Sequence, residues 1–161
     1  MFREMRRKNQ LMSLEDSVAV LKRGTSGVLA VSGDDGYPYA VPLSYVYHDS
    51  KIFFHSAKNG HKLDAITKEC KVSFCVTDKD EVVPEEYTTY FRSVIVFGKA
   101  RILENEAGKN AIKILAAKYS PDEKEEKTNA EIAKNYNAFC MIELDIEHIT
   151  GKEAKELIKQ R

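Results

Sequence analysis

The chain has 161 residues, which is enough for one domain with a substantial hydrophobic core. Its 25 basic residues balance its 25 acidic residues, and this argues against nonspecific binding to nucleic acid, which requires a basic excess. It has no apolar run near twenty residues and only three scattered cysteines, so we expect no membrane association and a reducing, cytoplasmic environment.

The first third of the chain predicts an arm, a helix and three strands. Residues 1–12 are expected to form the arm, and Ser13 then precedes a helical pattern, with Asp16 placed as in a capping box. Gly24 is a suitable end for this helix. Apolar or alternating segments separated by turn residues then predict strands at 27–32, 37–47 and 51–56, the first two forming a hairpin.

The rest of the chain predicts further helices and strands without a βαβ alternation. Helices are expected at 59–69, 104–118 and 129–136, strands at 71–77, 88–103 and 139–149, and loops or turns at 78–87, 120–128 and 150–152, before a last helical turn. Gly98 indicates a bulge or bend in the longest strand. This order predicts a mainly β fold over a single domain, 1–161: a small closed or split antiparallel β-barrel with peripheral helices.

The stretch 51–66 concentrates polar groups where a strand gives way to a helix. Ser56, His61 and Lys62 lie close to the expected helix N-terminus, whose unpaired N–H groups and partial positive charge suit a phosphate. The chain has neither a P-loop nor a G-x-G-x-x-G dinucleotide motif. Two interpretations therefore stay open at this point, an anion site and an ordinary polar surface loop.

His55 ends the strand 51–56, where alternation places its side chain on the same face as Phe53. One face of a barrel strand is buried, so His55 is either a core histidine or a pocket residue, and periodicity alone favours the core. The histidines show no spacing that would let them share a metal ion with carboxylates, so no metal site is expected.

Six segments share their order and spacing with a known family: 1–8, 34–47, 52–57, 60–62, 88–95 and 146–152. Together they resemble the FMN-binding split-barrel proteins related to pyridoxamine 5′-phosphate oxidase, and they look most like the nitroimidazole-resistance branch. The similarity extends over nearly the whole chain. It implies a split barrel and a homodimer that holds FMN at the subunit interface.

The resemblance also implies which residues bind the cofactor. Backbone groups between Val41 and Ser44 would lie along the flavin ring, which gives a reason for prolines in a strand that would otherwise need its donors. Ser93 matches a flavin contact that can come from the other subunit. The matching positions are Val41, Pro42, Leu43, Ser44, His55, Ser56, His61, Lys62 and Ser93, with Ser56, His61 and Lys62 at the phosphate.

The activity implied by the resemblance is reduction of small aromatic or nitro compounds, such as 5-nitroimidazoles, by hydride transfer from reduced flavin. His55 is the candidate catalytic histidine beside the cofactor, and His61 is the second candidate. No residues match those that hold the vitamin phosphate in the oxidase, so oxidation of pyridoxamine phosphate is not expected. Two alternatives stay open: a flavin-binding or storage module without turnover, and a split barrel that binds haem or the deazaflavin F420.

Overall fold

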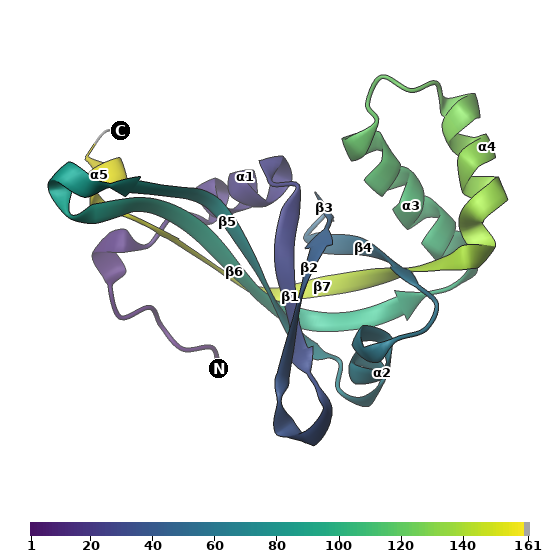
Figure 1. The fold of residues 1–161 in the computed structure, drawn as a ribbon, viewed down its shortest axis with the longest axis horizontal. Coiled ribbons are helices and arrows are strands. Elements are labelled where there is room, and N and C mark those ends of the chain that lie inside the picture. The colour runs from purple at the N-terminus through teal and green to yellow at the C-terminus, as the bar shows by residue number, and fades with distance from the viewer. Residues whose placement is uncertain (160–161) are drawn as a thin grey trace.

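The computed structural model describes residues 1–159 as one seven-stranded sheet with helices around it (Figure 1). The strands are β1 (Ser26–Ser32), β2 (Pro38–Ser44), β3 (Val46–His48), β4 (Lys51–Ala57), β5 (Lys71–Val83), β6 (Thr88–Leu103) and β7 (Phe139–Glu153). The helices are α1 (Leu14–Arg23), α2 (His61–Lys68), α3 (Asn105–Tyr119), α4 (Glu125–Asn135) and α5 (Lys155–Ile158). In this described part of the chain, no helix combines the length and the apolar character that crossing a bilayer requires.

The connection between the two outermost strands makes the sheet a split barrel. The strand order is β2-β1-β5-β6-β7-β4-β3, and every neighbouring pair is antiparallel. β2 and β3 lie at opposite ends of this order, yet the single residue Tyr45 joins them in the chain. The sheet must therefore curl until its edges meet, and because β2 and β3 are not paired with each other, the barrel stays split. The predicted mainly β split barrel with peripheral helices is confirmed.

Tyr45 also breaks the strand that the sequence predicts over 37–47. The hydroxyl of Tyr119, at the end of α3, accepts a hydrogen bond from the Tyr45 N–H (2.9 Å), and its one proton is shared between the carbonyl oxygens of Thr25 and Tyr45 (2.9 Å from the latter). A side chain thus occupies the main-chain groups that a neighbouring strand would otherwise satisfy. The side chain of Tyr45 is itself fully buried in the barrel.

Two groups of buried side chains hold the barrel and its largest helix in place. The main core fills the barrel and includes Leu29, Phe54, Phe74, Val94 and Leu144. A smaller core lies under α3 and consists of Val46, Phe53, Leu103, Ala111, Leu115 and Met141. Because β4 supplies Phe54 to one core and Phe53 to the other, this strand is buried on both faces.

The predicted hairpin and edge strand are both present. β1 pairs with β2 in register from Ser26 opposite Ser44 to Ser32 opposite Pro38. β2 has no second neighbour in the sheet, so its prolines remove no hydrogen bond from an inner strand. The bend expected at Gly98 is also confirmed, since the β6–β7 register shifts between Phe97 and Gly98. A Cβ on Gly98 would lie 2.0 Å from the carbonyl oxygen of Asp145.

Two strands are longer than the sequence predicts. β5 continues to Val83, so the loop expected at 78–87 is wrong over 78–83 and confirmed over 84–87, and β7 continues to Glu153, so the turn expected at 150–152 is wrong. The loop expected at 120–128 is shorter, because α4 begins at Glu125. Beyond a bulge after Thr77, β5 and β6 project away from the barrel as a ribbon (Figure 1).

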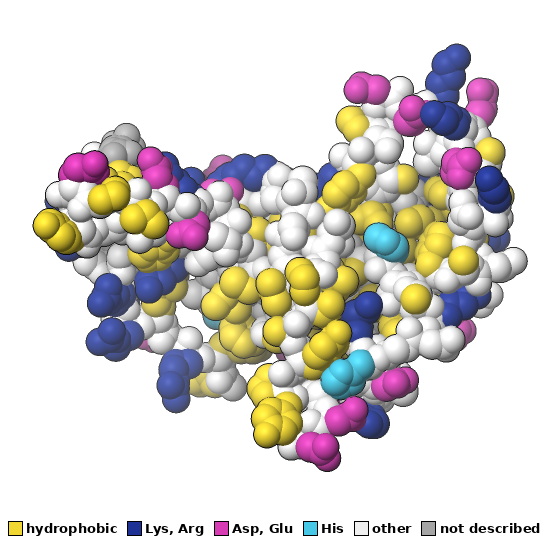
Figure 2. Space-filling view, in the orientation of Figure 1, with side chains coloured by type: hydrophobic (Ala, Val, Ile, Leu, Met, Phe, Trp, Pro, Cys, Tyr) yellow, Lys and Arg dark blue, Asp and Glu magenta, His cyan; other side chains and the backbone are white. Residues whose placement is uncertain are grey.

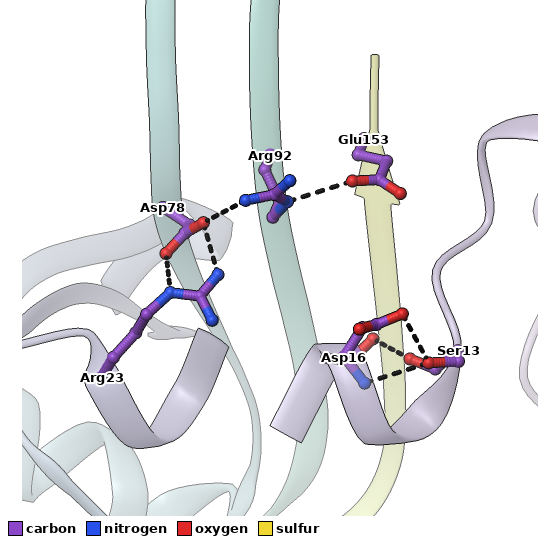
Figure 3. A network of polar contacts seen from close by, with 7 residues as sticks. Ser13, Asp16, Arg23, Asp78, Arg92 and Glu153 are labelled. Carbon is purple, nitrogen blue, oxygen red and sulfur yellow. Dashed lines mark hydrogen bonds and ion pairs between the residues drawn. The ribbon is translucent and has the colours of Figure 1, made fainter. Parts of the chain in front are cut away.

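Ion pairs that join four elements, α1, β5, β6 and β7, fix the root of this ribbon (Figure 3). Asp78 accepts two hydrogen bonds of 2.6 Å from Arg23, at the end of α1, and one of 3.1 Å from Arg92 on β6. Arg92 also donates to the buried Glu153 at 3.1 Å. Burial opposes ionisation of Asp78, but the hydrogen bonds from the two arginines outweigh it and keep its pKa below the ordinary value.

Candidate functional site

The end of β4 and the start of α2 form a short turn with unpaired main-chain donors. Gly60 precedes α2 with φ of +132°, a conformation that L side chains rarely adopt. No side chain caps the helix, and the first backbone bonds of α2 are those from Leu63 and Asp64 to the Gly60 carbonyl. The N–H groups of His61 and Lys62 therefore have no partner within residues 1–159, and they make an anion-binding helix start.

Lys62 and Ser56 supply a cation and a hydroxyl on the two elements that this turn joins, α2 and β4. Lys62 is half-buried and forms neither a hydrogen bond nor an ion pair with any residue that the structure describes. Ser56 is 4% exposed and lies opposite Cys140 of β7 in the β4–β7 ladder. Its hydroxyl, the Lys62 ammonium and the α2 amides together match the donor set that a phosphate monoester prefers.

His61 has partners of its own. Its ring stacks on Tyr39 of β2 with centroids 4.3 Å apart and planes inclined by 24°. Its Nε2 lies 3.5 Å from the Asp34 carboxylate, which also accepts a hydrogen bond of 3.1 Å from Lys68. The hydrogen bond and charge of Lys68, followed by the charge of His61, lower the pKa of Asp34. His61 therefore connects the β1–β2 hairpin to α2, whatever else it binds.

The structure corrects the sequence interpretation of His55 as a core residue. His55 is exposed, although it shares a strand face with the buried Phe53. α3 covers Phe53 but leaves the following outward position open to solvent. An exposed imidazole near the end of β4 is available to a ligand, which is what a role in chemistry requires.

The strand segment expected along the flavin ring presents two different faces. Val41 and Leu43 turn inward against the barrel core, whereas Pro42 and Ser44 are exposed. The outer edge of β2 has no strand partner, so its main-chain groups on that side are free to meet a ligand. Figure 2 shows hydrophobic side chains gathered over the β1–β2 hairpin.

Ser93 does not join the other candidate residues within one chain. Ser56 lies opposite Cys140, whereas Ser93 on β6 lies opposite Lys152, twelve residues further along β7. At about 3.3 Å per residue, that separation is roughly 40 Å along the strand. The structure thus brings together the edge of β2, the end of β4 and the start of α2, and leaves Ser93 elsewhere.

Ser93 borders a surface of the sheet that is covered only in part, where the ring of Phe2 in the N-terminal arm stacks on His148 (centroids 4.7 Å apart) and packs against Phe97 (5.6 Å). Outward side chains from five strands form two rows on this outer face: Pro42, Val28, Cys75, Ile95 and Thr150 in one row, and Ala40, Ala30, Ser73, Phe97 and His148 in the other. Val28 is 39% exposed, Ile95 41% and Phe97 37%. Ser93 points to the same side as Ile95, two residues further along β6.

Two residues near the site are not among the site residues that the sequence predicts. Tyr39 holds His61 by stacking, and Cys140 lies beside Ser56 although the two are far apart in the chain. Burial raises the pKa of the Cys140 thiol, and the charges of Lys62 and Lys58 oppose that shift. Only the β4–β7 pairing could have identified Cys140. In the described residues, no group of histidine, cysteine and acidic side chains is arranged to hold a metal ion.

Solved structures share this fold. A candidate 5-nitroimidazole antibiotic resistance protein from Bacteroides thetaiotaomicron superposes with a TM-score of 0.74 at 18% identity, covering 89% of this chain and 86% of that one. A conserved hypothetical protein from Mycobacterium tuberculosis superposes with a TM-score of 0.80 at 20% identity, covering 95% of this chain and 92% of that one. An FAD and heme binding protein from Mycobacterium smegmatis superposes with a TM-score of 0.75 at 20% identity, covering 95% of this chain and 80% of that one. These identities establish the fold alone.

The sequence itself identifies the family. No curated protein sequence matches the chain. The model of the pyridoxamine 5′-phosphate oxidase family matches residues 13–153, from the cap of α1 to the end of β7. This match spans the whole split barrel and both sides of the polar turn between β4 and α2. The chain therefore belongs to the pyridoxamine 5′-phosphate oxidase family.

Proposed function

We propose that the protein binds FMN and reduces small nitroaromatic compounds, such as 5-nitroimidazoles. The observation that carries the proposal is Lys62, a half-buried ammonium without a partner in the described chain, beside the unpaired amides of α2 and the buried Ser56 hydroxyl. This donor set fits a flavin phosphate. Similar folds occur in proteins named for 5-nitroimidazole resistance and for binding FAD and heme, which supports a flavin and this class of substrate.

Each group has a distinct task in the proposed reaction. Ser56, Lys62 and the α2 amides would hold the phosphate of FMN, and the free edge of β2 from Val41 to Ser44 would supply main-chain groups to its ring. The cofactor, when bound, would supply hydride transfer to the substrate. His55, exposed at the end of β4, donates a proton to the reduced substrate.

We also propose that two copies associate through the outer face. A contiguous surface containing Val28, Ile95 and Phe97, each more than a third exposed, is typical of an interface. Ser93 borders this face but lies far from Lys62 in its own chain, so docking of a second copy would offer Ser93 to the partner's flavin. A homodimer thus gives the isolated serine a function.

The absorption spectrum of the purified protein tests the cofactor directly. A flavin spectrum, followed by identification of the released cofactor by mass, is expected. Anaerobic reduction should bleach it, and one equivalent of a 5-nitroimidazole should restore it with formation of the two-electron product, the nitroso compound, and water. The amine requires six electrons and should form only after three rounds of flavin reduction by an external reductant. If oxygen but no nitro compound reoxidised the flavin, the protein would be a flavin-binding or storage module without nitroreductase activity. A haem spectrum would show that the protein binds haem instead of a flavin. A colourless protein that does not bind added FMN would refute the proposed function.

A further inference from the structure

The N-terminal arm, residues 1–12, is attached to β7 at two points and leaves a cavity between them. At one end the ring of Phe2 stacks on His148, with centroids 4.7 Å apart. At the other end the Met12 N–H donates a hydrogen bond of 3.0 Å to the Gly151 carbonyl. The cavity lies between the arm, the start of α1 and β7, and its volume of about 390 Å³ is typical of small-molecule sites.

The apolar wall of the cavity is built from all three of these elements. Its members are Phe2, Met5, Leu11, Met12, Leu14 and Ile149. Leu11 is 50% exposed and Leu14 is 67% exposed, so both leave apolar surface in contact with water. A ligand with an apolar chain would cover that surface, and its burial would favour binding.

The charged and polar groups of the cavity leave one cation unpaired. Lys8 is already paired with Glu4 at 2.7 Å, and the His148 Nε2 lies 2.9 Å from the Thr150 hydroxyl. Arg3 is exposed and forms neither a hydrogen bond nor an ion pair within residues 1–159. Its guanidinium is therefore available to a ligand, and its planar donors match a carboxylate in bidentate geometry.

The rest of the arm adds to the attraction for an anion. Residues 1–12 contain one acidic residue, Glu4, and four basic residues, Arg3, Arg6, Arg7 and Lys8. Figure 2 shows Lys and Arg side chains gathered over this arm, at the lower left. Arg6 and Arg7 are exposed but do not line the cavity, so they raise the local positive potential without contacting a ligand inside it.

We propose that the cavity binds a fatty acid, a single apolar chain that ends in a carboxylate. The carboxylate pairs with Arg3, and the chain lies between the arm and Ile149 of β7. One free guanidinium matches one negative charge, which favours a carboxylate over a phosphate monoester. Within one chain, His148 lies roughly 25 Å along β7 from Cys140, the residue opposite Ser56, so this site is separate from the proposed flavin phosphate site.

Calorimetric titration of the purified full-length chain with octanoate tests the proposal. Octanoate should bind about tenfold more tightly than octanol, which has the same chain without the charge. Decanoate should bind roughly tenfold more tightly than octanoate, because it buries two further methylenes. Arg3→Ala should weaken octanoate binding about tenfold and octanol binding less than twofold, whereas Arg7→Ala, on the same arm but outside the cavity, should change neither.

A second variant tests the apolar wall without disturbing the core. Leu11→Asp places a carboxylate at a half-exposed position of the wall and should weaken octanoate binding at least tenfold. Octanoate binding that Leu11→Asp left unchanged would overturn the assignment of the ligand to this cavity.

Three further results would overturn the proposal. They are equal affinities for octanoate and octanol, equal effects of Arg3→Ala and Arg7→Ala, and no octanoate binding at millimolar concentration. Binding only to vesicles that contain phosphatidylglycerol, lost equally on removal of Arg3 or Arg7, would replace the fatty-acid cavity by contact of the arm with an anionic membrane. None of these outcomes depends on bound flavin, so the proposed function is tested separately.

Discussion

The ring of Tyr39 stacks on the imidazole of His61 with centroids 4.3 Å apart. The contact joins the edge strand β2 to the first residue of α2, the two elements that border the proposed flavin site. Asp34, in the turn between β1 and β2, approaches the same imidazole from the hairpin end. His61 thus supports the geometry of the site, and Lys62 is left as the cation with no other partner among the described residues.

Replacement of His61 should therefore affect stability more than cofactor binding. We expect His61→Ala to lower the free energy of unfolding by about 0.5–1.5 kcal/mol, the range for an aromatic pair. FMN affinity should fall by less than in Lys62→Ala. Denaturant unfolding and calorimetry measure the two effects. If His61→Ala lost FMN as completely as the lysine variant, the imidazole would be a primary phosphate ligand.

Lys62→Ala should weaken FMN binding by about 1–3 kcal/mol, because a charge-assisted hydrogen bond to phosphate is lost. Lys68→Ala is the matched control. Lys68 lies on the same helix and pairs with Asp34, so its removal should leave FMN affinity nearly unchanged. Flavin fluorescence titration distinguishes the variants, and an unaltered affinity in Lys62→Ala would mean that the phosphate binds elsewhere.

His55→Ala should spare FMN binding and slow reduction of a nitroimidazole by about 10²–10⁴-fold, the usual contribution of general acid catalysis. The residue is exposed, so the substitution leaves no cavity in the core. Single-turnover reoxidation of the reduced flavin by the substrate isolates the step concerned. His48→Ala removes another exposed histidine, from the end of β3, and should react at the native rate. Equal rates for both variants would remove His55 from the mechanism.

The outer face is tested by placing a charge at its centre. Ile95→Lys should convert the dimer to a monomer and release flavin, because an unpaired ammonium would be buried between the two copies. Leu14→Lys alters a more exposed apolar residue on α1 and should remain dimeric. Sedimentation analysis gives the assembly state, and retention of the dimer by Ile95→Lys would move the interface to another surface.

Asp78 gives a prediction for the dependence of stability on pH. Its pKa is lowered in the folded chain, so its ion pairs stabilise the protein fully above the unfolded value near 3.9 and lose that contribution as pH falls through the folded pKa. Asp78→Asn should destabilise the protein by about 2–4 kcal/mol at pH 7, because two arginines lose their anion. In unfolding experiments the difference should shrink as the pH falls through the folded pKa, where Asp78 becomes protonated. Asp80→Asn, at an exposed neighbour, should have little effect at any pH.

Local patterns predicted the elements whose signals lie in adjacent residues. The Ser13 cap, the strand that became β6 and its bend at Gly98 all have short-range causes. The acidic segment after Thr77 instead suggests a loop, and it continues as a strand because Arg23 and Arg92, distant in the chain, neutralise Asp78. The strand propensity of a local segment contains no information about ion-pair partners that lie elsewhere in the chain.

The candidate site, like the fold, was predictable only where its signals lie in adjacent residues. The polar turn before α2 follows from its composition and spacing. His55 could not be assigned correctly from alternation, because α3, which begins only at Asn105, covers Phe53 and stops short of the next outward residue. The cavity under the N-terminal arm has the same origin, since it exists only where the arm lies against β7.

The pairing of β7 with β4, which are distant in the chain, determines the order in which the barrel folds. The β4–β7 ladder joins Ala57 to Phe139 and Lys51 to Asp145, pairings that close very long loops, whereas β5 and β6 are joined by a short connection. Non-local pairing slows folding, so we expect the β5–β6 hairpin to form early and β4 to dock late. Ser56 reaches its final position only in that last step. A flavin would therefore stabilise the finished barrel by mass action without acting as a template for its assembly.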